Sequence, residues 1–125
     1  MITAYPTVYI AGPYTAPTPE AVAANVARAQ ALGRALLEAA LAKGVHLVPV
    51  VPHSLSEGFA DLGSAEYWYA ATASVLIACD YVLLTPDWQD SKGALAEVEI
   101  AGDYWMPVYS TIDMLLAHMI ARSGR

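Results

Sequence analysis

The chain has 125 residues, of which 57% are hydrophobic and only 14% are charged. A chain of this length forms one compact domain, and its high apolar fraction excludes an intrinsically disordered protein. Six basic residues stand against twelve acidic ones, so the net charge of −6 opposes binding to the phosphate backbone of a nucleic acid polymer.

The first half of the chain predicts a strand, a helix and a second strand. Residues 7–11 form a short apolar run that ends at a Gly-Pro pair, which is typical of a buried strand. From residue 19 to about residue 44, apolar residues recur at spacings of mostly three and four, and this pattern predicts a helix. The apolar run at 45–51 predicts a strand, and the proline at 49 indicates either an edge strand or a strand that ends there.

The second half continues the alternation after a polar connection at 53–63. The pattern predicts a helix at 64–78, a strand at 81–85, a helix at 91–102, a strand at 106–109 and a helix at 112–121. Strands that alternate with helices predict an α/β fold with a parallel sheet of four to five strands, covered on both faces. Ligands bind at the carboxyl ends of such strands, so we expect the site in the loops at 12–18, 52–57 and 86–93.

Several classes of site are excluded by residue counts. The longest apolar stretch is far shorter than the roughly 20 residues of a membrane-spanning helix. The single cysteine, Cys79, excludes an internal disulfide, and three scattered histidines do not predict a metal site. We therefore expect a cytoplasmic protein without metal or cofactor. The high apolar fraction of so small a domain also predicts a homodimer or a larger homo-oligomer.

The strongest chemical signal follows the third predicted strand. Ser91 and Gly93 at the start of a helix leave free backbone N–H groups at the positive end of the helix dipole, an arrangement that binds anions. Glu97 lies on the second turn of the same helix among apolar neighbours. Taken alone, S-x-G-x-x-x-E is a weak motif, because serine caps and solvated helical glutamates are common.

Other motifs accompany it in a fixed order. They are V-Y-I-A-G-P at 8–13, Asn25 in the first helix, C-D-Y-V at 79–82 and W-x-x-S-x-G-x-x-x-E at 88–97. This ordered set resembles the nucleoside 2-deoxyribosyltransferase-like superfamily, especially its small bacterial and phage members. The resemblance implies that residues 1–125 form a single domain of this kind, a flavodoxin- or Rossmann-like three-layer sandwich that assembles as a dimer or larger.

The resemblance also implies an enzyme of nucleotide metabolism. In catalytic members a glutamate on this helix attacks the anomeric carbon of the sugar, and the matching residue is Glu97. Tyr9 matches the tyrosine that is hydrogen-bonded to this nucleophile. Ser91 and Gly93 match the segment that binds the 5′-phosphate in the nucleotide hydrolases, and Gly12-Pro13 matches a turn that approaches the sugar or phosphate.

Three further residues of the predicted ligand loops are candidates for substrate binding. His53 follows the second strand, where an imidazole either contacts ligand or caps a neighbouring carbonyl. Asp87 follows the third strand. Trp88 offers a ring for stacking on a base, although a tryptophan at this place equally fits a role in shielding the loop or an interface.

At residue 72 the sequence departs from the catalytic relatives. Many of them carry there an aspartate that helps to protonate the leaving base, whereas this chain has Thr72. Threonine is no general acid near neutral pH, and proton transfer of this kind contributes about 10²–10⁴-fold to the rate. His53 and Asp87 are candidate replacements, and Glu66 and Glu99 are weaker ones.

The sequence leaves three functions open. The leading hypothesis is an N-glycoside hydrolase or deoxyribosyltransferase that forms a covalent glycosyl-Glu97 intermediate. A nucleoside 5′-monophosphate is favoured over a nucleoside as the small-molecule substrate, because Ser91 occupies the phosphate position. The second hypothesis is a non-catalytic nucleotide-binding or sensing module, and the third is a structural subunit without a ligand.

Overall fold

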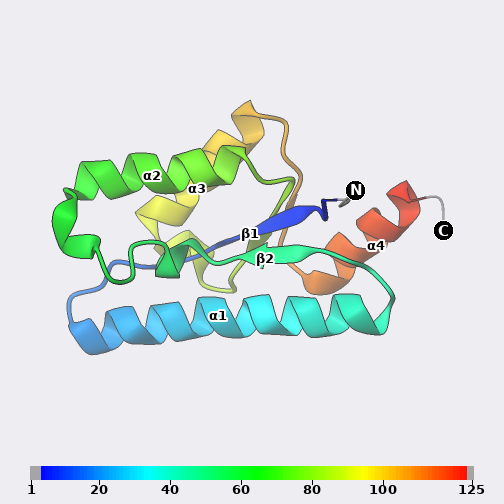
Figure 1. Ribbon diagram of the computed structural model, residues 1–125, viewed down its shortest axis with the longest axis horizontal. Helices are drawn as coiled ribbons and strands as arrows, with labels where there is room; N and C mark the ends of the chain where they lie inside the picture. Colours follow the sequence, from blue (N-terminus) through cyan, green and yellow to red (C-terminus); the bar gives the residue numbers. More distant parts are fainter. Residues whose placement is uncertain (1–3, 124–125) are drawn as a thin grey trace.

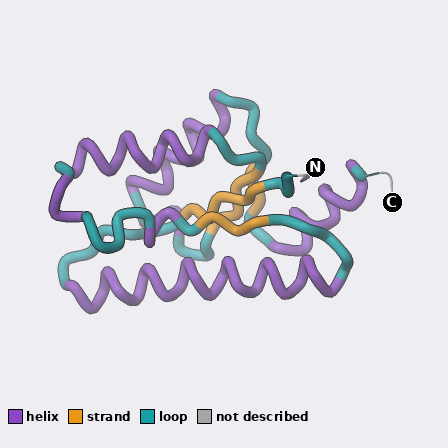
Figure 2. Tube along the Cα trace, in the orientation of Figure 1, coloured by secondary structure: helices purple, strands orange, loops and turns teal. Residues whose placement is uncertain are grey.

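The computed structural model describes residues 4–123 and has three layers, with a sheet between two pairs of helices (Figures 1 and 2). The strands are β1 (Thr7–Ala11), β2 (Val48–Val50), β3 (Tyr81–Leu84) and β4 (Val108–Tyr109). The α-helices are α1 (Pro19–Ala42), α2 (Ala65–Ile77), α3 (Lys92–Asp103) and α4 (Ile112–Arg122). Single 3₁₀ turns form η1 (Pro52–Ser54), η2 (Ala60–Leu62) and η3 (Trp88–Asp90). The predicted α/β alternation is confirmed, with four strands.

All strands of the sheet are parallel, in the order β2-β1-β3-β4. The chain leaves β1 toward one edge to form β2 and then crosses back to form β3 on the other side of β1. Such a reversal opens a crevice at the carboxyl ends of the two central strands, where open α/β sheets bind ligands. The loops that follow β1 and β2 gather at that end of the sheet, on the left in Figure 1.

Alternate residues of the central strands face the two helix layers. Val8 and Ile10 pack in the core that α1 and α4 cover, whereas Tyr9 and Ala11 pack in the core beneath α2 and α3. All four are fully buried. This two-residue period places the hydroxyl-bearing side chain of Tyr9 on the same face as α3, the helix that carries Glu97.

The predicted helix starts are present as side-chain caps. Thr18 Oγ1 accepts a hydrogen bond from the Ala21 N–H, and Ser91 Oγ accepts one from the Ala94 N–H, both at 3.1 Å. Each cap satisfies a backbone donor that the first turn of a helix leaves without a partner. The cap at Ser91 thus fixes where α3 begins.

Three strands are shorter than predicted, and β3 ends at Leu84 instead of residue 85. Residues 45–47 precede β2 and residue 51 follows it, and β4 begins at Val108 because the chain at 104–106 closes the end of α3. Trp105 has a left-handed φ of 58°, and the Met106 N–H donates to Ala101 O at 2.8 Å, which closes the helix end. Along the described residues, no helix combines the length and apolar character needed to cross a membrane.

Candidate active site

A cavity of about 650 Å³ opens at the carboxyl ends of the strands. All three predicted ligand loops contribute to it, together with α2 and α3. Its lining residues are Tyr9, Gly12, Pro13, Tyr14, Thr15, Pro52, His53, Leu55, Ser56, Ala60, Ala65, Trp68, Tyr69, Thr72, Ala73, Asp90, Ser91, Lys92, Gly93, Ala94, Ala96, Glu97 and Ile100. The volume is within the range of cavities that bind small molecules.

Tyr9 and Glu97 form a hydrogen-bonded pair in the floor of this cavity. The Tyr9 hydroxyl donates to Glu97 Oε2. No residue between 4 and 123 hydrogen-bonds to the other carboxylate oxygen, Oε1. The approach of Glu97 to Tyr9 that the resemblance implies is therefore present, and it leaves one oxygen of a fixed carboxylate available to a bound molecule.

Burial perturbs both members of the pair. Burial raises the pKa of Glu97 to about 7, although the hydrogen bond from Tyr9 lowers it in part. Burial also raises the pKa of the Tyr9 hydroxyl, and the neighbouring Glu97 charge raises it further. A carboxyl group that titrates near neutral pH inside a cavity is a frequent mark of a functional site.

Thr72 lies beside this pair, on α2. Its hydroxyl interacts with the Tyr9 hydroxyl and opposes the rise in the pKa of Tyr9. The same hydroxyl donates to Tyr69 O at 3.0 Å. Residue 72, where the resemblance implies an acid, thus lies next to the Tyr9–Glu97 pair and holds a group that bears no readily released proton.

The start of α3 forms one end of the cavity, which we call the anion end: Ser91, Lys92 and Gly93. The N–H groups of Lys92 and Gly93 have no partner within the described chain, and Ser91 Oγ keeps its own proton for donation because it only accepts from α3. A Cβ on Gly93 would lie 3.4 Å from Tyr69 Oη, so the phenol reaches over this end. These groups are donors suited to an anion.

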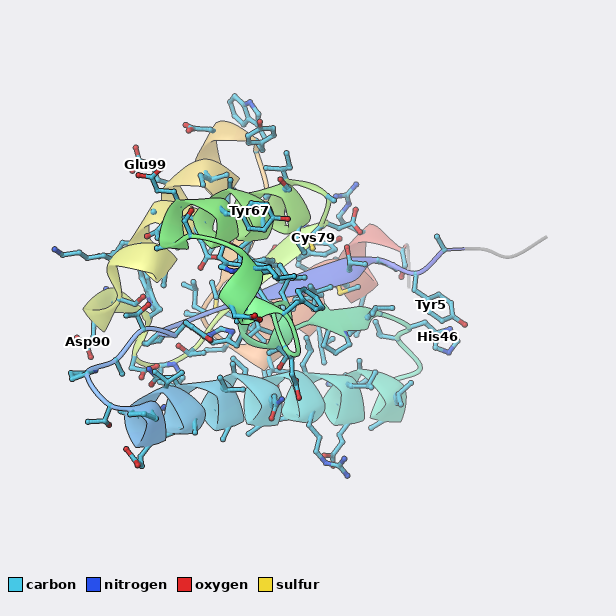
Figure 3. All side chains as sticks on the ribbon, turned by 60° about the vertical axis from the view of Figure 1, so that its left-hand side comes forward. Tyr5, His46, Tyr67, Cys79, Asp90 and Glu99 are labelled. Atoms are coloured by element: carbon cyan, nitrogen blue, oxygen red, sulfur yellow. The ribbon has the colours of Figure 1, made fainter. Side chains whose placement is uncertain are left out.

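Of the acidic side chains Asp90, Glu99 and Glu66, only Asp90 lines the cavity. Asp90 lines the cavity beside Ser91, where its negative charge opposes an anion. Glu99 is exposed and projects outward from α3 (Figure 3). Glu66 is exposed on α2 and does not line the cavity. Neither Glu99 nor Glu66, the weaker candidates for a replacement acid, therefore reaches the cavity.

His53 is buried in the cavity wall and is only 7% exposed. Its Nε2 lies 3.1 Å from both Gly12 O and Pro13 O. Because carbonyl oxygens only accept, Nε2 carries the hydrogen and His53 is the donor. Burial lowers the pKa of His53, which keeps the ring neutral. The imidazole thus caps backbone carbonyls, and its hydrogen is already engaged.

Two predicted ligand-binding residues lie outside the cavity wall. Asp87 accepts a hydrogen bond from Thr85 Oγ1 at 2.8 Å and pairs with Arg28. Trp88 packs against the core beneath α2 and α3, which is the shielding role that the sequence left open. The structure therefore brings Gly12, Pro13, His53, Ser91 and Gly93 to the cavity with Tyr9 and Glu97, and it places Asp87 and Trp88 elsewhere.

Sequence reasoning missed Tyr14 and Tyr69 as cavity residues. Tyr69 precedes Thr72 by three residues, so the two share a face of α2, and this spacing could have identified it. Tyr14 follows Gly12-Pro13 directly in a predicted ligand loop.

Residues 6–110 match a known family, described as a domain of unknown function (DUF4406). The chain belongs to this family. No curated protein matches the sequence. The matched span of this DUF4406 domain includes every residue of the cavity, from Tyr9 to Ile100. Over residues 4–123, the DUF4406 domain has no cluster of three His, Cys, Asp or Glu side chains that could hold a metal ion.

Proposed function

We propose that this protein is an enzyme that cleaves the N-glycosidic bond of a nucleoside 5′-monophosphate. The observation that carries the proposal is the Tyr9–Glu97 pair, a carboxylate fixed by one oxygen in a cavity of nucleotide size. Resemblance of the sequence motifs to nucleoside 2-deoxyribosyltransferase-like proteins supports the same reaction.

In the first step, Glu97 Oε1 attacks C1′ of the sugar. The C1′–N bond breaks, its electron pair leaves with the base, and the base takes up a proton. Tyr9 holds Oε2 and so keeps the carboxylate in one orientation for attack. In the second step, water attacks C1′, the C1′–Oε1 bond breaks with its electron pair returning to the carboxylate, and the water gives one proton to solvent as the sugar phosphate leaves. A second base that attacks C1′ in place of water, and likewise loses a proton to solvent, gives transfer.

The phosphate is proposed to bind at the anion end. The two free N–H groups, the Ser91 hydroxyl and the dipole of α3 favour an anion there. The positive charge of Lys92 and the negative charge of Asp90 offset each other. The backbone N–H groups, rather than net charge, therefore account for the proposed preference for a phosphate.

The leaving base has no obvious acid in this chain. Thr72 holds the expected position, the His53 hydrogen is bound by two carbonyls, and Asp87 lies outside the cavity wall. We therefore assign the proton to solvent water, which limits the rate. The lack of an acid in the cavity also favours a second candidate function, a module that binds a nucleotide in this cavity without cleaving it.

The experiment that separates the two functions incubates pure protein with a panel of nucleoside monophosphates and nucleosides and measures free base by chromatography. Base release that is lost in Glu97→Ala supports the enzyme. Calorimetric binding of a nucleotide without base release supports the binding module, whereas neither binding nor release contradicts both.

We further propose that the protein acts in the cytoplasm as a homodimer or larger oligomer. The outer surface of α2 and α3 carries large apolar side chains that one chain leaves uncovered: Tyr67, Ile77, Leu95, Tyr104 and Trp105. Trp105, at the end of α3, is 92% exposed. Exposed apolar surface of this kind is typical of an interaction face, and light scattering of the free protein measures the mass of the assembly.

A further inference from the structure

A chain of polar contacts outside the cavity joins the loop after β1 to the loop after β3. At its centre, Arg28 of α1 donates through Nη2 to Asn25 Oδ1, and its Nε lies 3.6 Å from Asp87 Oδ2. Asn25 Nδ2 in turn donates to Tyr14 O at 3.0 Å. On the other side, Thr85 Oγ1 donates to Asp87 Oδ1 at 2.8 Å. One guanidinium therefore bridges two loops that are far apart in the sequence.

The two loops also touch directly at Gly12. A Cβ on Gly12 would overlap the buried side chain of Thr85, so only glycine permits this approach. The Thr85 N–H donates to Ala11 O at 2.9 Å, which holds the two strand ends together. Thr85 therefore both orients Asp87 through a hydrogen bond and packs against Gly12 of the loop after β1.

Side chains from outside the loop hold three successive carbonyl groups of its backbone. His53 donates to Gly12 O and Pro13 O, and Asn25 donates to Tyr14 O. Gly12, Pro13 and Tyr14 line the cavity, whereas Asn25 and Arg28 do not. His53 itself lines the cavity, whereas the Tyr14 carbonyl is held by Asn25, a residue that a ligand in the cavity does not touch.

We propose that Arg28 is a positioning residue for ligand binding, which sets the Gly12–Tyr14 wall through Asn25 and Asp87. The kinetic part of this inference rests on the proposed function. The Arg28 side chain is 54% exposed, so its ion pair contributes little to the stability of the whole fold. Its effect is local, because loops open more easily than the core of a domain.

The first test measures ¹⁵N relaxation of the free protein and needs no substrate. In Arg28→Met, the order parameters of Tyr14, Thr15, Asp87 and Trp88 should fall from about 0.85 toward 0.6, the values of rigid and flexible backbone. Arg34→Met is the matched control, because Arg34 lies on the same helix and pairs only with Glu38 across one turn. Unchanged order parameters in Arg28→Met would overturn the inference.

Arg28→Lys separates the two arms of the bridge. Lysine keeps a positive charge for Asp87, but its single nitrogen does not replace the two nitrogens that Arg28 directs to two partners. We expect order parameters to recover at residues 87–88 and to stay low at residues 14–15. Equal recovery of both segments would show that charge alone suffices and would contradict the bridging role.

The second test measures base release. Arg28→Met should raise KM about threefold to tenfold and change kcat less than twofold, because Tyr9 and Glu97 are untouched. Flexible loops with an unchanged KM would contradict a role in ligand binding. If no variant and no unmutated protein releases base, the proposed reaction fails, while the relaxation data still decide whether Arg28 positions the wall.

Discussion

Tyr9 and Glu97 are 88 residues apart in the sequence, and their side chains meet through one hydrogen bond beneath α3. The pairing follows from the repeat of each element. Alternation of side chains along β1 turns Tyr9 toward α3, and Glu97 on the second turn of α3 lies above the end of that strand. Burial of this pair keeps a carboxyl group near its protonation midpoint at neutral pH, which has consequences for both stability and rate.

Glu97→Gln should stabilise the protein above pH 7 and leave its stability unchanged near pH 4. The pKa of Glu97 is about 7 in the folded protein against 4.5 ordinarily, so the unfolding free energy falls as pH rises through this window. The shift corresponds to at most about 3 kcal/mol, which glutamine recovers at high pH. Thermal unfolding of both proteins at pH 4 and pH 8 measures the effect.

Glu99→Gln is the matched control for that prediction. Glu99 is exposed on the same helix, and its replacement removes the same formal charge. Its effect on Tm should be small and equal at the two pH values. A gain in Glu97→Gln that does not depend on pH would contradict the raised pKa of the buried Glu97 carboxyl group.

The rate of base release should rise with pH and level off above about pH 7, because Glu97 attacks only as the carboxylate. A nucleoside is the substrate of choice for this profile, since a phosphate itself titrates near pH 6. Tyr9→Phe should move the midpoint to higher pH, because the Tyr9 hydrogen bond lowers the pKa of Glu97. A rate that falls as pH rises through 7 would instead assign Glu97 as an acid.

Thr72→Asp should accelerate base release about tenfold or more near pH 6. The substitution places an acid beside Tyr9 at the position where the resemblance to nucleoside 2-deoxyribosyltransferase-like enzymes implies one, and general acid catalysis contributes about 10²–10⁴-fold. Thr72→Asn is the control, because the amide has a similar shape and no acidic proton. Equal rates for the two variants would show that the proton of the leaving base does not pass through this position.

The unmutated protein should bind a nucleoside monophosphate at least about tenfold more tightly than its nucleoside. Charge-assisted hydrogen bonds contribute roughly 1.5–3 kcal/mol each, and the helix dipole adds about 0.3–1 kcal/mol. Ser91→Asp should reverse the preference, because aspartate still caps α3 but repels the phosphate. Calorimetry near physiological ionic strength tests this, and equal affinities would leave Ser91 as a helix cap only.

The fold was predictable because local patterns agree with it. Valine-rich runs, the 3.6-residue period of α1 and the serine and threonine caps all point to alternating strands and helices. The start of β4 was not predictable, because a non-glycine residue, Trp105, adopts the left-handed conformation that closes α3. Sequence gives little warning of such a cap.

The parts of the site that lie at strand ends and helix starts were predictable, because the order of these elements along the chain determines where they meet. Strand ends and helix starts place Tyr9, Ser91 and Glu97 in one crevice. The position of Asp87 outside the cavity was not predictable, because its ion-pair partner, Arg28, is exposed on α1 and belongs to none of the sequence motifs. Contacts between side chains of distant elements depend on packing angles that a pattern of apolar residues does not specify.

The stereochemistry of the product tests the central claim most directly. Base release in the presence of methanol yields a methyl glycoside phosphate, whose anomeric configuration is read by NMR. A covalent glycosyl-Glu97 intermediate requires two displacements at C1′, so the account predicts that the β configuration of the nucleotide is retained. An inverted α product, or a mixture of both anomers, would contradict nucleophilic attack by Glu97.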